Sequence, residues 1–352
     1  MVLFKKSGIL DKKENVMTSL GHIQYLAGKI TPSMRLTENM DISTWRQEAH
    51  AKMSELLGLP LKNCNTDFTV TNIEDVKNYK RVTFHFQSEP DYYVPCTLLV
   101  PKGVEKPVPG VICLQGHSSG AHISVGIPKF PEDEEDIAGG RDFAVRAVQE
   151  GYCAISIEQR YMGVNGQRKD TGYPACLKDN AAMAALLIGR TAVGERVWDV
   201  HRLIDVIEEH LPKYIDTKQI ICMGNSGGGT TTFYAACYDE RIRLAMPSCS
   251  VCSYDDSIMA MYHCPCNFVP NIRKYFDMGD LGSLIAPRPL VVVCGDKDPI
   301  FPLHGVKKSF DAIKNTYEKF GNKDDCQLVI GSGGHQFYPD DAWPVANRLL
   351  KK

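Results

Sequence analysis

A serine followed by three glycines stands between two apolar stretches in the segment ICMGNSGGGT, residues 221–230. Gly224, Ser226 and Gly228 satisfy the pattern G-x-S-x-G, which can place a nucleophilic serine on a sharp turn between a strand and a helix. A serine hydroxyl attacks a carbonyl carbon only when a neighbouring imidazole takes its proton and a carboxylate orients that imidazole. The segment therefore predicts Ser226 as the nucleophile of an acyl transfer, provided that an acid and a histidine follow.

A phosphate-binding loop is the alternative interpretation of the same glycines. Gly224 and Gly229 have the spacing of a P-loop, but Thr230 stands where that loop requires a lysine to contact the β- and γ-phosphates. The glycine spacing also fails the G-x-G-x-x-G fingerprint of dinucleotide-binding proteins. We therefore do not expect a bound nucleotide at this turn.

The acid and the histidine are expected at the ends of later strands, in the chain order serine, acid, histidine. The apolar run PLVVVCG opens into DKDPIFP, which offers Asp296 and Asp298, and the run CQLVIG opens into SGGHQF, which offers His335. We predict Asp298 as the acid, because Asp296 directly follows a glycine and is placed to shape the turn. His335 is the predicted base, since His304 precedes the last strand and His263 precedes the acid.

Two backbone N–H groups are needed to bind the oxyanion that forms in acyl transfer. One is expected to belong to Gly227, the residue after the nucleophile, and the other to the loop after the third strand. That loop is LQGHSSG, and we predict the N–H of His117, with Ser118 as the alternative.

Residues next to these positions are candidates for contact with the substrate. The segment EQRYMGVNGQR, 158–168, follows a strand at the same edge of the sheet, so Arg160, Tyr161 or Arg168 could touch the substrate. Ion pairing and loop packing are the alternative interpretation for these three residues. Phe301 and Phe337 follow the acid and the base and are expected to line the pocket.

Two further segments carry groups that bind ions. The segment HCPC, 263–266, has the residue types of half a zinc site, but the sequence shows no second ligand pair nearby, which favours a buried loop. The acidic run PEDEED, 131–136, is expected to be a solvated loop, although it could select basic substrates. We therefore predict neither a metal ion nor an organic cofactor.

Composition places the chain among ordinary globular proteins. Its 352 residues carry a formal net charge of −2, whereas a nucleic-acid-binding domain normally has a basic excess. The 13 cysteines are an odd number and most stand singly in apolar runs, which favours reduced thiols and a cytoplasmic location. No run approaches the roughly 20 apolar residues of a membrane span, and lysines interrupt any N-terminal signal peptide. We expect neither nucleic acid nor membrane as a partner.

The elements that must hold these residues follow from periodicity. Residues 1–80 are expected to form a helical extension packed on the main domain, with the helix ISTWRQEAHAKMSELLGL capped by Thr44 and Gln47 and ended by Gly58 and Pro60. Residues 81–352 alternate short, continuous apolar runs with helical segments, which is typical of a mostly parallel sheet covered by helices on both faces. The predicted fold class is therefore α/β, with the serine, the acid and the histidine at one edge of the sheet.

The chain from about residue 80 onward resembles the α/β-hydrolase superfamily, in particular its branch of acetyl xylan esterases and dienelactone hydrolases. The resemblance rests on GNSGGG, GDKDPIFP and GGHQF, and on segments outside these motifs such as GRTAVGERVWDVHRLIDVIEEH and IAPRPLVVVCG. It implies Ser226 as nucleophile, Asp298 as acid and His335 as base. Two positions depart from the branch, because Gly227 stands where glutamine is usual and Gln115 where histidine is usual.

Hydrolysis of a carboxylic ester through an acyl-enzyme is the function that these features predict. A small-molecule ester, acetyl-type and carried by a carbohydrate, is the expected substrate. An exopeptidase or a lactone hydrolase would use the same three residues, and both stay alternatives. A non-catalytic binding module on this fold is less favoured, because such modules usually lose one of the three groups. The sequence makes no prediction of oligomeric state.

Overall fold

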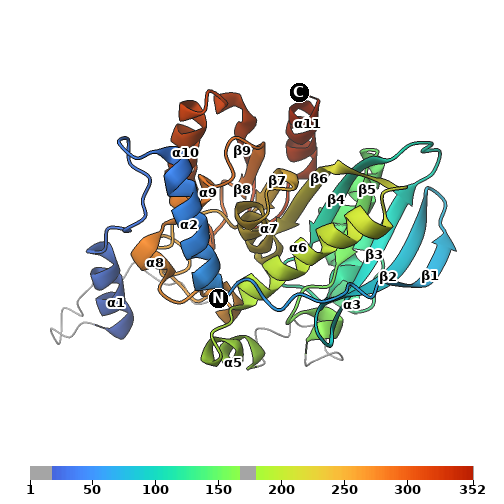
Figure 1. The fold of residues 1–352 in the computed structure, drawn as a ribbon, viewed down its shortest axis with the longest axis horizontal. Coiled ribbons are helices and arrows are strands. Elements are labelled where there is room, and N and C mark those ends of the chain that lie inside the picture. Colours follow the sequence, from blue (N-terminus) through green and yellow to red (C-terminus); the bar gives the residue numbers. More distant parts are fainter. Residues whose placement is uncertain (1–17, 167–179, 352) are drawn as a thin grey trace.

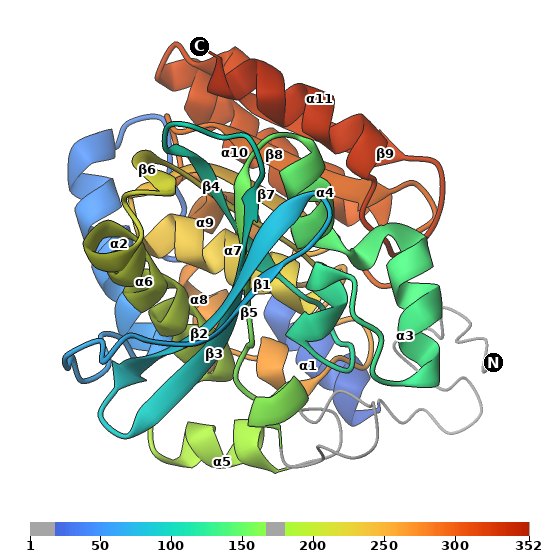
Figure 2. The same ribbon diagram turned by 90° about the vertical axis from the view of Figure 1, so that its right-hand side faces the viewer.

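The computed structural model describes residues 18–166 and 180–351. Within these described residues, one nine-stranded sheet lies at the centre, with the strand order β1-β2-β3-β5-β4-β6-β7-β8-β9 (Figures 1 and 2). The strands are β1 (Thr69–Asp75), β2 (Tyr79–Glu89), β3 (Tyr92–Pro101), β4 (Val108–Leu114), β5 (Cys153–Ile157), β6 (Ile215–Asn225), β7 (Ile242–Ser248), β8 (Leu290–Gly295) and β9 (Cys326–Gly331). The pairs β1–β2, β2–β3 and β3–β5 are antiparallel, and all pairs from β5 through β4 to β9 are parallel.

Helices fill the connections between the parallel strands, as the periodicity predicted. The helices are α1 (Ser19–Gly28), α2 (Ile42–Leu57), α3 (Pro131–Asp136), α4 (Phe143–Gln149), α5 (Ala181–Leu187), α6 (Ala192–His210), α7 (Gly227–Tyr238), α8 (Ile272–Tyr275), α9 (Met278–Gly282), α10 (Leu303–Lys319) and α11 (Pro339–Leu350). The helices α6, α7 and α10 lie against one face of the sheet, and α4 and α11 lie against the other. The prediction of a parallel sheet covered on both faces is confirmed.

The central strands contain continuous apolar runs because both of their faces are buried there. In β6, Ile220 and Cys222 belong to the core under α6, α7 and α10, whereas Ile221 and Met223 belong to the core under α4 and α11. Successive side chains of a strand point to opposite faces, so a strand buried on both sides needs a continuous apolar run. The runs that the sequence shows are therefore those of a sheet with two cores.

The N-terminal part differs from the prediction in two respects. The cap of α2 is Asp41 rather than Thr44, since the Asp41 carboxylate accepts a hydrogen bond of 2.8 Å from the Thr44 N–H. Gly58 ends this helix, as predicted, and it adopts the left-handed conformation. Residues 1–80 are also not purely helical, because β1 lies within them and pairs with β2. The boundary drawn near residue 80 is thus no break in the fold.

The acidic segment 131–136 is a helix, α3, and the prediction of a loop was wrong. Pro131 opens the helix, where a missing N–H costs nothing. Asp133 is buried and accepts hydrogen bonds from the N–H groups of Lys129 and Phe130, at 2.8 and 2.9 Å. Its carboxylate also lies 2.8 Å from Nε2 of His122. One of the six residues thus fixes a local turn, while most of the others are exposed.

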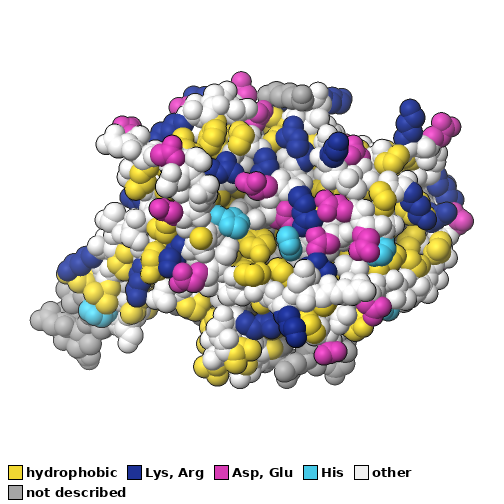
Figure 3. Space-filling model, viewed as in Figure 1, with side chains coloured by type: hydrophobic (Ala, Val, Ile, Leu, Met, Phe, Trp, Pro, Cys, Tyr) yellow, Lys and Arg dark blue, Asp and Glu magenta, His cyan; other side chains and the backbone are white. Residues whose placement is uncertain are grey.

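The surface carries charges of both signs. On the face shown in Figure 3, lysine and arginine side chains are interspersed with aspartate and glutamate. Within residues 18–166 and 180–351, no helix is both long enough and apolar enough to cross a bilayer.

Candidate active site

The carboxyl ends of β4, β6, β8 and β9 meet at one edge of the sheet, because these strands run parallel within one sheet. Ser226 follows β6 directly, Asp298 stands three residues after β8, and His335 stands four residues after β9. In an open parallel sheet this edge is where ligands bind, since the loops there converge. The topology alone thus brings together three residues that are distant in sequence.

Ser226 occupies a strained turn between β6 and α7. Its backbone angles are φ 56° and ψ −122°, which an L-residue rarely adopts. The Ser226 N–H donates a hydrogen bond of 2.9 Å to the carbonyl oxygen of Ser248 on β7, which holds the turn. A Cβ atom on Gly224 would lie 2.6 Å from the carbonyl carbon of Gly228, so the two glycines of G-x-S-x-G pack backbone against backbone. The motif therefore has glycine at these two positions because the backbone around the turn leaves no room for a Cβ atom.

Asp298 and His335 form a hydrogen bond of 2.8 Å between Oδ2 and Nδ1. The other carboxylate oxygen accepts hydrogen bonds from the N–H groups of Ile300 and Phe301, at 2.8 and 3.1 Å. Burial would raise the pKa of the Asp298 carboxyl, but the hydrogen bonds from His335 and the two N–H groups outweigh burial and lower that pKa. Asp298 therefore stays ionised, and its contact with Nδ1 favours the tautomer whose Nε2 accepts a proton.

Asp296 has a different role in the same loop. Its Oδ1 accepts a hydrogen bond of 2.8 Å from the N–H of Gly333, and its own N–H donates to the carbonyl of Gly331 at 2.9 Å. These bonds join the turns after β8 and β9. Asp298, and not Asp296, is the aspartate that contacts the imidazole.

Ser226 and His335 line the same pocket, which has a volume of about 260 Å³. Its lining combines backbone and side chains from the ends of β4, β6, β8 and β9 with residues of the segment after β7. The lining residues are Gly116, His117, Arg141, Asn225, Ser226, Gly227, Tyr262, His263, Cys264, Asn267, Ile300, Phe301 and His335. The pocket thus contains the predicted nucleophile, the predicted base and both predicted oxyanion residues.

The predicted oxyanion residues lie against each other. Gly227 is the first residue of α7, where helix geometry leaves the N–H without an intrahelical partner. A Cβ on Gly227 would lie 3.0 Å from Cε1 of His117, so the imidazole of His117 covers this glycine. Gln159 links the two loops, because its side chain donates to the Gln115 carbonyl and accepts a hydrogen bond of 2.8 Å from Thr231 on α7.

Of the two phenylalanines expected in the pocket, only Phe301 lines it. The Phe301 ring stacks on the imidazole of His335 with a centroid distance of 5.7 Å and an interplanar angle of 15°. Phe337 instead packs edge-on against Phe143 of α4 in the second core, and 4% of its surface is exposed. Because the Phe337 side chain packs into this second core, it does not line the pocket.

Arg160 and Tyr161 also lie outside the pocket lining. Arg160 is buried and forms two hydrogen bonds of 2.8 Å with Asp199, an ion pair with Glu89 and a stacking contact with the Tyr92 ring. The Tyr161 hydroxyl donates to Glu195. Both side chains therefore serve the ion pairing and loop packing that was the alternative interpretation. Arg168 lies outside the described residues.

Asn225, Arg141 and Tyr262 are among the pocket residues that the sequence analysis did not predict. Asn225 stands inside the G-x-S-x-G motif and its Oδ1 accepts a hydrogen bond of 2.9 Å from Ser248, a contact that the motif does not encode. Arg141 follows two glycines and pairs with Asp136 at 3.1 Å. Tyr262 is 80% exposed and borders the pocket. Among these three residues, only Tyr262 had an indication in the sequence, because it directly precedes the segment HCPC.

His263 belongs to the pocket but not to the hydrogen bond between Asp298 and His335. Its Nε2 lies 3.2 Å from the Ser257 hydroxyl, and its ring meets Phe301 edge-on at a centroid distance of 5.5 Å. Burial and the neighbouring imidazole of His117 lower the pKa of His263 to about 4. His263 is therefore a neutral wall of the pocket at physiological pH.

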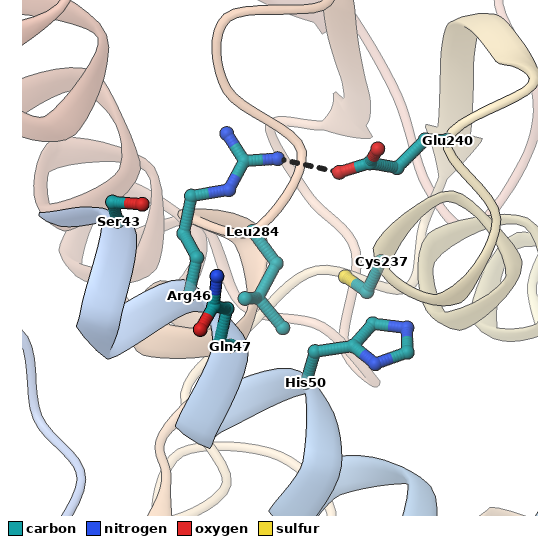
Figure 4. Close-up of a pocket in the computed structure, with 7 residues that line it drawn as sticks. All are labelled: Ser43, Arg46, Gln47, His50, Cys237, Glu240 and Leu284. Atoms are coloured by element: carbon teal, nitrogen blue, oxygen red, sulfur yellow. Dashed lines mark hydrogen bonds and ion pairs between the residues drawn. The ribbon is translucent and has the colours of Figure 1, made fainter.

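A second hollow, shown in Figure 4, lies between α2 and the body of the domain. It has a volume of about 590 Å³ and is crossed by an ion pair of 3.0 Å between Arg46 and Glu240. Burial raises the pKa of the Cys237 thiol, which lies beside this hollow with His50, and so keeps the thiol protonated. The hollow therefore lies along the packing interface of α2 with the domain, and its cysteine, Cys237, is not an activated nucleophile.

The sheet order, the serine turn after β6 and the acid and histidine after β8 and β9 define an α/β-hydrolase fold. Residues 10–329 match the model of the Abhydrolase family, and the chain belongs to this family. The matched region includes Ser226 and Asp298 and ends before His335.

Similar proteins include esterases. The candidate hydrolase YtaP of Bacillus subtilis (strain 168) is 26% identical over 244 residues, which are 68% of this chain and 77% of YtaP. The 4-O-methyl-glucuronoyl methylesterase of Phanerochaete carnosa (strain HHB-10118-sp) is 28% identical over 188 residues, 46% of each protein. Among solved structures, a candidate acetyl xylan esterase from Bacteroides fragilis NCTC 9343 has a TM-score of 0.74 at 17% identity, covering 91% of this chain and 83% of its own. The glucuronoyl esterase from Solibacter usitatus has a TM-score of 0.68 at 16% identity, covering 92% and 98%.

Proposed function

We propose that the protein is a serine-dependent hydrolase of carboxylic esters that works through an acyl-enzyme on Ser226. The observation that carries the proposal is the 2.8 Å hydrogen bond between Asp298 and His335 beside a strained serine in the same pocket. An imidazole held by an ionised carboxylate is the group that turns a serine hydroxyl into a nucleophile. The three side chains follow the ends of β6, β8 and β9, which is the arrangement typical of a catalytic triad on this fold.

The reaction follows from the chemistry of these groups. His335 Nε2 takes the proton of the Ser226 hydroxyl while Oγ bonds to the ester carbonyl carbon. The N–H groups of Gly227 and His117 stabilise the oxyanion, and the ester C–O bond breaks as His335 returns the proton to the leaving alcohol. Water, deprotonated by the same imidazole, then attacks the acyl-enzyme and releases the acid.

A small ester carried by a carbohydrate is the proposed substrate. The names of the similar proteins include acetyl xylan and glucuronoyl esterases, and the pocket of about 260 Å³ suits a small acyl group better than a long chain. Tyr262 offers an exposed ring at the pocket, and aromatic rings give an apolar face on which a sugar can rest. Arg141 adds a cation that can donate hydrogen bonds to substrate oxygens.

A cytoplasmic location is part of the same proposal. No disulfide joins any of the cysteines in the part of the chain that the structure describes. Reduced thiols on this scale are typical of proteins in a reducing compartment.

Ser226→Ala tests the proposed reaction. Loss of the nucleophile should lower kcat by about 10⁶-fold, because a catalytic triad acts as a unit. The wild-type protein should bind one equivalent of a fluorophosphonate on Ser226, whereas S226A should bind none. Circular dichroism of both proteins checks that the fold is unchanged. An S226A protein with a near-normal rate of ester hydrolysis would exclude Ser226 as the nucleophile.

A substrate panel separates the proposed esterase from its alternatives. We expect hydrolysis of an acetylated xylose or of a methyl glucuronate, with little turnover of an aminoacyl peptide or a lactone. Preferential cleavage of the peptide would identify an exopeptidase, and preferential opening of the lactone would identify a lactone hydrolase. A fluorophosphonate adduct without turnover of any ester in the panel would contradict the proposed substrate class.

A further inference from the structure

His117, Cys264 and Cys266 form a cluster beside the predicted oxyanion loop. The two sulfur atoms and one imidazole nitrogen all lie within 4.8 Å of one another. Nε2 of His117 is 3.2 Å from Sγ of Cys266. Both cysteines are buried, at 4% and 1% exposure, and His117 is half-buried. Three side chains that can bind a metal thus converge from two segments about 150 residues apart in sequence.

The donor set suits a thiophilic divalent cation. Zn²⁺ binds cysteine sulfur at about 2.3 Å and histidine nitrogen at about 2.0–2.1 Å, usually in a tetrahedron. These bond lengths place neighbouring ligand atoms roughly 3.6–3.8 Å apart, a separation that small side-chain rotations can reach from the observed cluster. The three side chains supply two sulfur atoms and one nitrogen and no carboxylate oxygen, the ligand that Mg²⁺ and Ca²⁺ prefer.

The cluster lies at the wall of the candidate active site. His117 and Cys264 line the pocket that contains Ser226, whereas Cys266 is buried behind them. Apolar side chains, including Met162, Ala182 and Ala192, pack around the two cysteines. A metal with three protein ligands keeps one open position, and a metal held by this cluster would adjoin the pocket, because two of its three ligands line that pocket.

A second cluster competes for the same kind of ion. Sγ of Cys249, a carboxylate oxygen of Asp298 and a ring nitrogen of His335 also lie within 4.8 Å of one another. A metal there would have to replace the 2.8 Å hydrogen bond between Asp298 and His335. A metal in the cluster of His117, Cys264 and Cys266 would likewise replace a hydrogen bond, that of 3.2 Å between His117 Nε2 and Cys266 Sγ. The two thiols of this cluster make it the softer site.

We propose that His117, Cys264 and Cys266 form a zinc-binding site whose occupancy blocks the pocket beside Ser226. Binding converts two thiols and a neutral imidazole into two thiolates and one nitrogen ligand, with the release of two protons to solvent. The ion then occupies the pocket wall next to Gly227, so it holds the His117 loop and leaves less room for an ester. The metal site stands by itself, whereas the inhibition rests on the proposed esterase function.

Metal binding is measured on the full-length protein after removal of metals with a chelator. Titration with Zn²⁺ against a chromophoric chelator should give one equivalent per chain. Replacing both thiols, Cys264→Ser and Cys266→Ser, should weaken binding about 100-fold or more, because each removes a thiolate ligand. Co²⁺ should give intense visible bands and a thiolate charge-transfer band in the wild type that disappear in this double variant.

Cys249→Ser is the matched control, since it removes the thiol of the competing cluster. It should leave Zn²⁺ affinity and the Co²⁺ spectrum unchanged. Loss of binding in C249S with retention in the double variant would assign the ion to the other cluster and overturn the proposal. A titration that shows no bound Zn²⁺, or a Co²⁺ spectrum without thiolate bands, would also overturn the proposal. If the double variant fails to fold, His117→Ala removes the imidazole ligand and should weaken binding in the same assay.

Inhibition is measured as the fraction of each protein's own uninhibited rate of ester hydrolysis. Zn²⁺ should inhibit the wild type at one equivalent, EDTA should restore the rate, and the double variant should lose this response. Stoichiometric Zn²⁺ binding in a protein with no ester hydrolysis would reject the proposed function and keep the metal site. Hydrolysis that is indifferent to bound Zn²⁺ would reject the blocking of the pocket.

Discussion

Two aspartates at the end of β8 stand two residues apart and contact different partners. Asp298 faces the imidazole of His335 and also accepts two backbone hydrogen bonds, whereas Asp296 holds the N–H of Gly333. The backbone bonds fix the orientation of the Asp298 carboxylate before any substrate binds. An orienting acid contributes to catalysis by holding the histidine in one tautomer and by stabilising the imidazolium that forms.

Asp298→Asn should therefore lower kcat by about 10⁴-fold, because an amide can hold the wrong tautomer of the imidazole. The measurement is the kcat for a small ester at a pH above neutrality, together with KM. We expect KM to change little, since Asp298 is buried behind His335 and does not line the pocket.

Asp296→Asn is the matched control, with the same chemical change two residues earlier. The amide oxygen can still accept the hydrogen bond from Gly333, so kcat should fall less than about tenfold. An equal loss in both variants would show that the loop as a whole, rather than the pairing with His335, supports catalysis.

At the scale of single residues, the sequence predicted the pairing of Asp298 with His335 and the place of Phe301 in the pocket. The other described candidates for substrate contact, Arg160, Tyr161 and Phe337, lie outside the pocket lining. The acid and the histidine follow from chain order and strand ends, which are local signals. Arg160 could not be assigned in this way, because its partners Glu89 and Asp199 are 71 and 39 residues away and pair with it only in the folded sheet. Residue type alone does not distinguish a buried ion pair from a substrate contact.

At the scale of elements, a buried glutamate supports the loop that carries His117. Glu158 follows β5 and accepts hydrogen bonds from the N–H groups of Ala121 and Val164, at 3.2 and 3.5 Å. It thereby joins two single-turn helices, at Ala121–Val125 and Gly163–Asn165. Burial raises the pKa of Glu158 to about 7, although these hydrogen bonds oppose the rise. Glu158 therefore binds a proton more tightly in the folded protein than in the unfolded chain.

Stability should consequently fall as pH rises between the two pKa values of Glu158. The unfolded carboxyl titrates near its ordinary value of about 4.3 and the folded one near 7. Below the lower value both states are protonated and Glu158 imposes no penalty. Above the higher value the folded state must hold a buried carboxylate, which costs about 4 kcal/mol in all, most of it between pH 4.5 and 8.

Glu158→Gln removes this titration. The difference in unfolding free energy between E158Q and wild type should shift in favour of E158Q by about 3 kcal/mol between pH 4.5 and 8. Urea unfolding of both proteins across this range measures it, and titrations that the two proteins share cancel. A difference that is independent of pH would show that Glu158 ionises equally easily in both states.

The sequence predicted the interior elements better than the edges. The central strands are continuous apolar runs because two cores need them, and this pattern is visible without a structure. The exposed strand β1 has no buried residue, so no hydrophobic pattern marked it. The helix α3 was not predicted because an acidic run is typical of a solvated loop. The burial of Asp133 depends on contacts with His122 and Ser119, which belong to another segment.

At the scale of the whole molecule, the N-terminal helix is part of the main core. Trp45, Ala49, Met53 and Leu57 form a stripe of buried residues along α2, each four positions from the next. They share one core with α6, α7 and α10 (Figure 1). Arg46 on the same helix pairs with Glu240 across the hollow of Figure 4. The sequence predicted this helix, but its partners are more than 100 residues away and could not be identified from the pattern.

Met53→Ala should therefore destabilise the whole domain and not a detachable segment. Met53 is fully buried, and truncating a buried methionine to alanine typically costs about 2–5 kcal/mol through lost burial and a residual cavity. Thermal and urea unfolding, followed by circular dichroism and by tryptophan fluorescence, should show one coincident transition moved to lower temperature and denaturant concentration. Leu187→Ala, at a position that is 87% exposed, is the control and should change stability by less than about 0.5 kcal/mol. Two separate transitions in M53A, with only the first displaced, would mean that α2 folds independently of the sheet that carries Ser226.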